Sequence, residues 1–295
     1  MSRIVVFGSI NLDVIIPVER LPEPGETLLG GDVVISPGGK GANQAHAARL
    51  AGADVAMVGR VGDDGLAEPA LALLAGAGVD LSGVGTSSRT TGCATIWSGP
   101  DGSSTIVVAP GANADLRADD VTDALLHPGA ILLLQQEVPL GENARVIKRA
   151  SSRGVTTILN AAPALVPPGG MLKEVDYLVV NEIELQMICE LRGLSGDGLP
   201  ERLARQLGTV VVATYGTGGV LRTDGRSTLH IPAHRVEVVD TTGAGDTFVG
   251  VFAACLARGL DETRTLELAN TAAALSCTRR GAQAAQPKWE EFAHR

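Results

Sequence analysis

Short apolar runs alternate with segments of helical length along most of this chain. Runs rich in Val, Ile and Leu predict strands at residues 4–7, 55–58, 131–134, 156–159, 177–180 and 210–213. Ala- and Leu-rich segments predict helices near 41–50, 66–75, 141–151, 183–191, 199–207, 244–258 and 261–278. Continuous apolar strands alternating with helices indicate an α/β fold, with a mainly parallel sheet covered on both faces.

Two stretches break this rhythm. The first contains apolar segments at 12–18 and 28–36, and the second resembles a hairpin, with strands at 92–97 and 105–109 around the turn sequence Pro100-Asp101-Gly102. Because no helix separates these segments, we expect a small separate sheet of four strands, formed by two excursions from the main domain.

Composition narrows the class of protein. The 295 residues are 45% hydrophobic, which is ample for a core, and the net charge of −9 argues against a nucleic-acid partner. The longest apolar runs are far below the ~20 residues of a membrane helix, and the N-terminus lacks a signal-peptide pattern, so we expect a cytoplasmic protein without a membrane partner. The spacing of the four cysteines indicates reduced thiols, not a disulfide or a zinc site: Cys93, Cys189, Cys255 and Cys277.

Polar residues follow five of the predicted strands directly. They are Asn11 and Asp13 after 4–7, the segment 135–137 with Glu137, Asn160, Asn181 and Thr214. Each alone is explained as well by an ordinary strand cap, but five at the carboxyl edge of one sheet indicate a ligand site. Asn11 and Asp13 are two apart on an extended segment and so face the same side, which suits a polyol, although an Asx turn remains an alternative.

Two glycine-rich segments open predicted helices. Gly38-Gly39-Lys40-Gly41-Ala42-Asn43 permits close backbone approach but lacks the spacing and the Ser or Thr of a Walker A loop. In Asp240-Thr241-Thr242-Gly243-Ala244-Gly245-Asp246-Thr247-Phe248, three successive amides at a helix N-terminus form an anion site. Asp246 beside them is either a general base or a carboxylate that complements the helix dipole.

With GSINLD, PGET, GGKGANQA, NEIE, DTTGAGDTF and RRGAQ in this order, the chain resembles the PfkB-type carbohydrate kinases from Val5 to about Gln286. The resemblance implies one kinase domain over 1–295, with a three-layer α/β/α core and a four-stranded β lid formed by 11–36 and 90–110. It also implies transfer of the γ-phosphate of ATP to the 5-hydroxyl of D-ribose, and a homodimer that forms through the lids.

The resemblance assigns roles to particular residues. The sugar contacts would be Asn11, Asp13, Gly39, Lys40, Asn43, Glu137 and Asp246. Asp246 would be the catalytic base, next to an anion hole formed by Gly243, Ala244 and Gly245. The ATP contacts would be Asn181, Thr214, Gly216, Thr217, Gly218, Gly219, Gly245 and Asn270. Glu184 would organise Mg²⁺ through water, which suits an ion that takes few direct protein ligands.

The resemblance further implies a site for K⁺ or another monovalent cation beside the anion hole. Its residues would be Asp240, Thr242, Ser276, Arg279, Gly281 and Ala285. Two residues depart from the pattern: Ala285 stands where such kinases commonly have serine, and Pro37 stands where an aromatic residue is common.

Alternative functions remain open at this point. Deoxyribose, another pentose, a ketohexose or a nucleoside could be the acceptor, although a nucleoside needs an apolar slot and the predicted lid offers little beyond Trp97. A non-catalytic sugar sensor is disfavoured by the intact segment 243–246, and a Rossmann dehydrogenase by the absence of GxGxxG spacing after the first strand.

Overall fold

The computed structural model describes residues 2–99, 104–165 and 170–294, and its centre is a nine-stranded sheet with the order β13-β12-β11-β10-β9-β8-β1-β4-β5. The strands are β1 (Ile4–Phe7), β4 (Val55–Gly62), β5 (Asp80–Ser87), β8 (Ile131–Leu134), β9 (Thr156–Asn160), β10 (Tyr177–Asn181), β11 (Val210–Thr214), β12 (Val220–Thr223) and β13 (Thr228–Ile231). All neighbours pair in parallel except the antiparallel β11–β12 and β12–β13. The predicted mainly parallel sheet is therefore confirmed.

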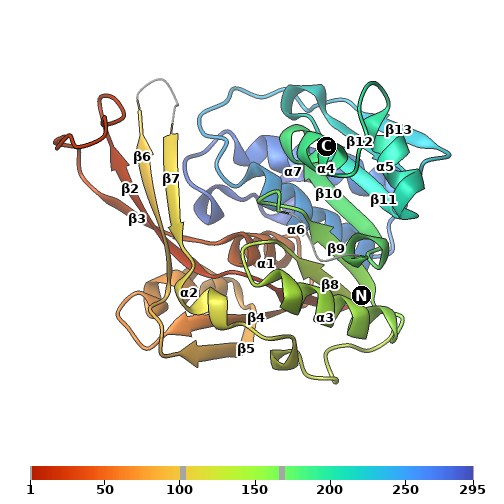
Figure 1. The fold of residues 1–295 in the computed structure, drawn as a ribbon, viewed down its shortest axis with the longest axis horizontal. Helices are drawn as coiled ribbons and strands as arrows, with labels where there is room; N and C mark the ends of the chain where they lie inside the picture. Colours follow the sequence, from red (N-terminus) through yellow and green to blue (C-terminus); the bar gives the residue numbers. More distant parts are fainter. Residues whose placement is uncertain (1, 100–103, 166–169, 295) are drawn as a thin grey trace.

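Helices cover both faces of this sheet and complete three layers (Figure 1). One core contains side chains from α1 (Lys40–Leu50), α2 (Ala67–Ala77), α6 (Ala244–Ala257), α7 (Glu262–Ser276) and α8 (Trp289–Phe292). The other contains side chains from α3 (Leu140–Ser151), α4 (Glu182–Leu191) and α5 (Leu199–Leu207). Ile4 and Val6 face the first core and Val5 and Phe7 the second, because successive side chains of a strand alternate between its faces.

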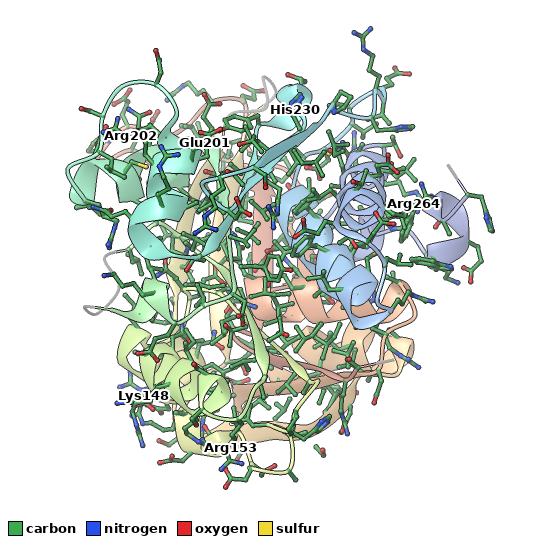
Figure 2. The ribbon with its side chains drawn as sticks, turned by 90° about the vertical axis from the view of Figure 1, so that its right-hand side faces the viewer. Lys148, Arg153, Glu201, Arg202, His230 and Arg264 are labelled. Carbon is green, nitrogen blue, oxygen red and sulfur yellow. The ribbon has the colours of Figure 1, made fainter. Side chains whose placement is uncertain are left out.

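Charged side chains surround these layers. Figure 2 shows Lys148 and Arg153 at the α3 side of the molecule and Arg202 on α5, all near its outer surface. No helix in the described ranges has the length and apolar character of a membrane span. All four cysteines carry free thiols. Cys189 and Cys255 are buried, whereas Cys93 and Cys277 are half-buried.

A second sheet of four strands stands apart from the main one, at the left of Figure 1. Its order is β3-β2-β6-β7, with β2 (Asn11–Pro17), β3 (Val34–Gly38), β6 (Gly92–Ser98) and β7 (Ser104–Ala109). The predicted strand at 28–36 is wrong over 28–33, where Gly30-Gly31-Asp32 interrupts the apolar run. The predicted turn at 100–102 lies outside the described residues.

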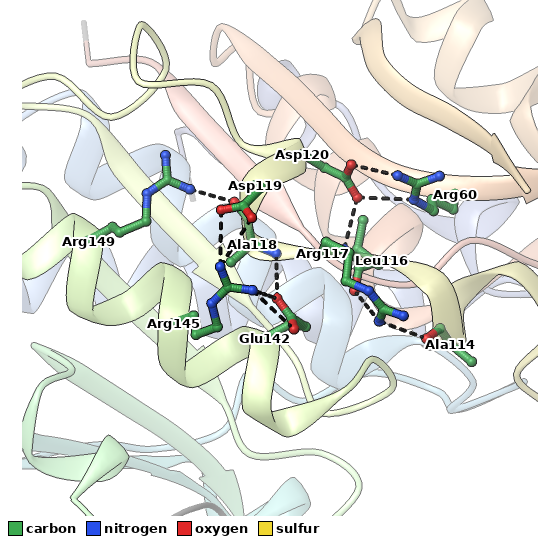
Figure 3. A network of polar contacts seen from close by, with 10 residues as sticks. All are labelled: Arg60, Ala114, Leu116, Arg117, Ala118, Asp119, Asp120, Glu142, Arg145 and Arg149. Atoms are coloured by element: carbon green, nitrogen blue, oxygen red, sulfur yellow. Dashed lines mark hydrogen bonds and ion pairs between the residues drawn. The ribbon is translucent and has the colours of Figure 1, made fainter.

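The chain returns from the small sheet to the main one through η1 (Gly111–Asp115) and η2 (Ala118–Asp120), and ion pairs fix this return (Figure 3). Arg60 of β4 donates to both carboxylate oxygens of Asp120, at 3.0 and 2.6 Å. Glu142 of α3 accepts from the Ala118 amide at 2.8 Å, and Arg145 bridges Glu142 and Asp119. The small sheet is thereby anchored to two elements of the core.

Candidate active site

The polar residues at the strand ends lie at one edge of the main sheet, around the N-termini of α1 and α6. A cavity of about 190 Å³ opens there. Its lining includes Lys40, Asn160, Asn181, Glu184, Thr214, Gly243, Gly245 and Asp246. Residues from three strands and three helices thus share one cavity, as expected for the carboxyl edge of an open α/β sheet.

Asp246 is buried in the first turn of α6, and both of its carboxylate oxygens are held by α1. Oδ2 accepts a hydrogen bond from Asn43 Nδ2 at 2.9 Å, and Oδ1 accepts one from Gln44 Nε2 at 2.9 Å. The helix begins after Gly243, whose φ of +73° favours glycine. The Ala244 amide donates to the Thr241 carbonyl at 3.2 Å, while Gly243 and Gly245 line the cavity.

Asp13 and Glu137 lie on the side of Asp246 that faces the small sheet. Burial, followed by the charges of Glu137 and Asp246, raises the pKa of Asp13 to about 7. Glu137 accepts from the Ser9 hydroxyl at 2.6 Å and from the Lys40 amide at 3.0 Å, which joins the first strand end to the start of α1. Three carboxylates therefore gather beside the transition between the two sheets.

The backbone at the start of α1 runs very close to these groups. A Cβ on Gly38 would stand 2.1 Å from Asp13 Oδ2, and one on Gly39 would stand 2.8 Å from the Asn11 amide nitrogen. Gly39 also has a φ of +86°. Glycine is required at both positions because any side chain would occupy the space of the polar groups.

Lys40 balances part of the negative charge. The charges of Asp246, Glu137 and Glu184 raise the pKa of the Lys40 ammonium, with Asp246 contributing most, against the opposing effect of burial. The side chain lines the cavity as well, so its charge is available to a ligand bound there.

Glu184 and Asn181 form a capping box at the start of α4. The Asn181 amide donates to Glu184 Oε2 at 2.9 Å, and the Glu184 amide donates to Asn181 Oδ1 at 2.8 Å. Burial is the main cause that raises the pKa of Glu184. The capping box accounts for Oε2 and leaves Oε1 as a further oxygen beside the cavity.

The other residues assigned to ATP occupy two places. Thr214 ends β11 at the cavity and is followed by the turn of η4 (Gly216–Gly218). Gly216 in this turn and Gly219 directly after it have positive φ. Thr217 and Gly218 belong to the same turn. Asn270 on α7 instead donates to the Pro232 carbonyl at 2.8 Å, which ties α7 to the segment after β13.

The residues assigned to a monovalent cation lie around Asp240. Its Oδ1 accepts from the amide and the hydroxyl of Thr242 at 2.9 and 2.7 Å, and its Oδ2 accepts from the Gly281 amide at 2.8 Å. The amide of Arg279 donates to the Ser276 carbonyl at 3.2 Å, and Ala285 is buried in η5 (Gln283–Ala285). Asp240 therefore joins the glycine loop before α6 to the turn after α7. Within the described part of the chain, no cluster of three or more His, Cys, Asp or Glu residues could hold a metal ion.

Comparison with known proteins identifies the family. The model of the pfkB family carbohydrate kinases matches residues 1–289. The chain belongs to this family.

Among the relatives, a ribokinase from Lactococcus lactis is 36% identical over 99% of this chain and 96% of its own length. Among solved structures, a ribokinase from Thermotoga maritima has a TM-score of 0.91 and 32% identity, covering 100% of this chain and 99% of its own. An Arabidopsis thaliana ribokinase complexed with ribose and ATP has a TM-score of 0.89 and 30% identity, covering 100% and 98%. This pfkB family member is therefore a carbohydrate kinase, which transfers a phosphoryl group to a hydroxyl.

Several residues that support the site of this carbohydrate kinase had no place among the expected site residues. Ser9, Gln44, Asn113 and Gln283 each hydrogen-bond a residue of the site, and Gln135 hydrogen-bonds Gln44. Gln44 was adjacent to Asn43, and Gln135 followed a predicted strand, so a signal existed for both. Gln283 ends the RRGAQ segment, but nothing in the sequence links it to Asn43. Asn113 carried no signal, because its partner Asn11 is 102 positions away.

Proposed function

We propose that this kinase transfers the γ-phosphoryl group of ATP to the 5-hydroxyl of D-ribose, with Asp246 as the general base. The observation that carries this proposal is the buried carboxylate of Asp246 between two chemically different regions. Toward the main sheet is a cavity with Lys40 and a helix N-terminus, which suits phosphates, and toward the small sheet are Asp13 and Glu137, which suit hydroxyls. The ribokinase relatives, one of them complexed with ribose and ATP, support ATP and ribose as the substrates.

In this mechanism Asp246 accepts the proton of the sugar hydroxyl as that oxygen attacks the γ-phosphorus. Asn43 and Gln44 each occupy one lone pair of the carboxylate, and a further lone pair remains for the proton. Negative charge on the transferred group is stabilised by Lys40 and by the amides of Gly243 and Gly245 in the proposed anion hole. The Ala244 amide joins this anion hole only by leaving the Thr241 carbonyl, to which it donates at 3.2 Å.

The side chains that bind the sugar are those of Asn11, Asp13, Asn43 and Glu137. Gly39 and Lys40 bring the backbone close to the sugar. Amides and carboxylates in alternation suit a polyol, whose hydroxyl groups each donate and accept. Asp13 supports this role because its Oδ1 is buried without a hydrogen-bond partner among the described residues. A sugar hydroxyl is a suitable donor for that oxygen.

ATP is held by Asn181, Thr214 and the turn at 216–219, with Gly245 and Asn270 as further contacts. Glu184 fits a magnesium ion bound through water, because one oxygen is fixed by the capping box and the other lies at the cavity. When bound with ATP, Mg²⁺ neutralises phosphate charge. Glu184 would hold the ion through its water molecules, and its charge also raises the pKa of Lys40.

A monovalent cation, K⁺ in the first instance, is proposed between the glycine loop and the turn after α7. Asp240, Thr242, Ser276, Arg279, Gly281 and Ala285 would surround it. The support is that Asp240 accepts hydrogen bonds from the amides of Thr242 and Gly281 and so joins the glycine loop to the turn after α7. An ion bound there would fix the same two segments further.

The small sheet is proposed as a lid, formed by 11–36 and 90–110 within a single kinase domain, and as the surface of a homodimer. Val34, Ile35, Ile106 and Val107 are each more than half exposed on its strands. The register places Val34 and Ile106 on one face of the sheet and Ile35 and Val107 on the other. An exposed apolar face of a sheet is stabilised when a second copy covers it.

The test is ADP release measured across ribose, deoxyribose, other pentoses, ketohexoses and nucleosides. Ribose is expected to have the highest kcat/KM, while a preference for a nucleoside would overturn the choice of substrate. Asp246→Asn is expected to fold and to bind ATP but to lose about 10²–10⁴ in kcat. A variant that kept more than roughly a tenth of wild-type kcat would remove Asp246 as the base.

A further inference from the structure

A chain of buried side-chain amides runs from Asp246 into the centre of the main sheet. Gln44, at the start of the second turn of α1, is completely buried. Its Nε2 donates to Asp246 Oδ1 at 2.9 Å and to Asn160 Oδ1 at 3.0 Å. Its Oε1 accepts from Gln135 Nε2 at 2.7 Å. Both ends of the Gln44 amide are therefore used by the protein.

The direction of this chain is set by Asp246. An ionised carboxylate only accepts hydrogen bonds, so Gln44 has to turn its Nε2 toward Asp246. Its Oε1 then faces Gln135, which in turn has to present Nε2. Reversing the Gln44 amide would bring its oxygen against that of Asp246 in a buried place, where an unmade hydrogen bond is costly.

Gln44 lies behind the site, not in it. Asp246 and Asn160 both line the cavity, whereas Gln44 is sealed behind them and reaches it only through these two residues. Its backbone is equally constrained, because a Cβ on Gly250 of α6 would stand 2.5 Å from the Gln44 carbonyl oxygen. The close approach of α1 to α6 therefore depends on Gly250. This approach places the Gln44 side chain within hydrogen-bond distance of the Asp246 carboxylate.

We propose that Gln44, itself oriented by Gln135, is a positioning residue for phosphoryl transfer, which fixes the plane of the Asp246 carboxylate. The inference rests on Asp246 being the base. Asn43 holds one oxygen and Gln44 the other, so the carboxylate cannot rotate, and its remaining lone pair stays aimed at the acceptor hydroxyl. Gln135 acts one step further back, through Gln44.

The test uses Gln44→Met and Gln135→Met, which keep side-chain length without the amide, together with the double variant. Gln44→Met is expected to lower kcat by about 10–100-fold, as misplacement of a reacting group does, with KM for ribose and ATP little changed. Gln135→Met is expected to lower kcat by roughly 3–10-fold, and the double variant to be no slower than Gln44→Met, because one residue acts through the other. Thr265→Val on α7 is the matched buried control, expected to keep wild-type kcat because its Oγ1 has no partner among the described residues.

The inference is overturned if kcat of Gln44→Met stays within about twofold of wild type, or if this variant changes only the KM for ribose. It is also overturned if the fold-loss of kcat in the double variant is the product of the fold-losses in the two single variants. If Gln44→Met does not fold, Gln135→Met is the deciding variant. An unchanged kcat in Gln135→Met contradicts the proposal that these hydrogen-bonded amides orient Asp246. Loss of kcat in Asp246→Asn with normal kcat in Gln44→Met would refute only the role of Gln44. Retained kcat in Asp246→Asn would instead refute the proposed base.

Discussion

Asn113 donates a hydrogen bond from Nδ2 to Oδ1 of Asn11 at 2.8 Å, although 102 positions separate the two residues. The same side chain donates to the Ile10 carbonyl at 3.1 Å and accepts from the Ile10 amide at 2.9 Å. It therefore ties the start of β2, where the chain enters the small sheet, to η1, through which it leaves. Asn11 is held through its Oδ1, and its Nδ2, which has no hydrogen-bond partner among the described residues, can face a sugar.

Replacing Asn113 should weaken sugar binding without touching the nucleotide. Asn113→Asp keeps the size of the side chain but places an oxygen against Asn11 Oδ1 and the Ile10 carbonyl. Loss of buried hydrogen bonds costs about 1–3 kcal/mol, so we expect KM for ribose to rise by roughly tenfold or more. Steady-state kinetics checks this, and an equal rise in both KM values would mean that Asn113 only maintains the fold.

Asp13→Ala should raise KM for ribose strongly and KM for ATP little. The reason is that its buried Oδ1 has no partner among the described residues, while a sugar hydroxyl can donate to it. Removal of a charged partner from a buried hydrogen bond costs upward of about 1–3 kcal/mol. Equal effects on the two substrates would make Asp13 a structural residue.

The raised pKa of Asp13 also predicts a pH-dependent cost to stability. The folded protein holds this proton up to pH of about 7, whereas the unfolded chain releases it near 3.8, the ordinary pKa of an aspartate. Because the folded state binds more protons in this window, stability falls as pH rises from about 4 to 7. Asp13→Asn should therefore be more stable than wild type above pH of about 7, by on the order of 2–4 kcal/mol, and equal to it near pH 4. Urea unfolding of both proteins across this range is the measurement, and a difference that did not change with pH would contradict it.

Gly250→Ala should separate α1 from α6. Its Cβ would stand 2.5 Å from the Gln44 carbonyl oxygen and 2.7 Å from Ala47 Cβ. Overpacking of this kind destabilises by about 1–3 kcal/mol, and we expect kcat to fall too because Asp246 is held across the same contact. Gly76→Ala on α2 is the control: nothing lies within 4 Å of its Cβ, so it should stabilise by about 0.5–1 kcal/mol with unchanged kcat.

Oligomeric state can be tested on the small sheet. Val107→Asp places a charge on a side chain that is 61% exposed on β7, and we expect it to convert a dimer into a monomer in light scattering. Ile183→Asp, at a 70% exposed residue of α4, should leave the dimer intact. A wild-type monomer at micromolar concentration would refute the proposed dimer.

Residue patterns predicted the buried parts of this fold better than its edges. The six apolar strands were found because parallel strands covered on both faces carry uninterrupted Val, Ile and Leu. The edge strands β5 and β13 and the hairpin partner β12 were missed, since polar residues and, in β5, Gly83 and Gly85 interrupt their patterns.

The residues of the site were also predictable from the sequence only in part. Residues in glycine-rich segments or directly after strands could be located from the sequence, and Asn160, Asn181 and Thr214 do share one cavity. The bonds by which Asn113 orients Asn11 and Gln283 orients Asn43 could not be predicted, because they exist only after distant segments have packed together. Their local sequence carries no trace of the partner.

Potassium should raise kcat without contacting the substrate. Asp240 already joins the glycine loop to the turn at 279–285 through Thr242 and Gly281. An ion bound to neighbouring carbonyls would fix the same loop, and therefore the direction of the amides that face developing charge.

Preorganised donors are worth about 10²–10³ in rate apiece when removed, so partial disorder of this loop should be measurable in kcat. We expect kcat to fall several-fold when potassium is replaced by sodium, and further with a bulky organic cation, at constant ionic strength. Ala285→Ser adds a hydroxyl at the turn and should lower the potassium concentration needed for half-maximal activity, leaving the maximum unchanged. Indistinguishable kcat values in all three salts would show that Asp240 alone orders the loop, and the proposed cation site would then have no role in the reaction.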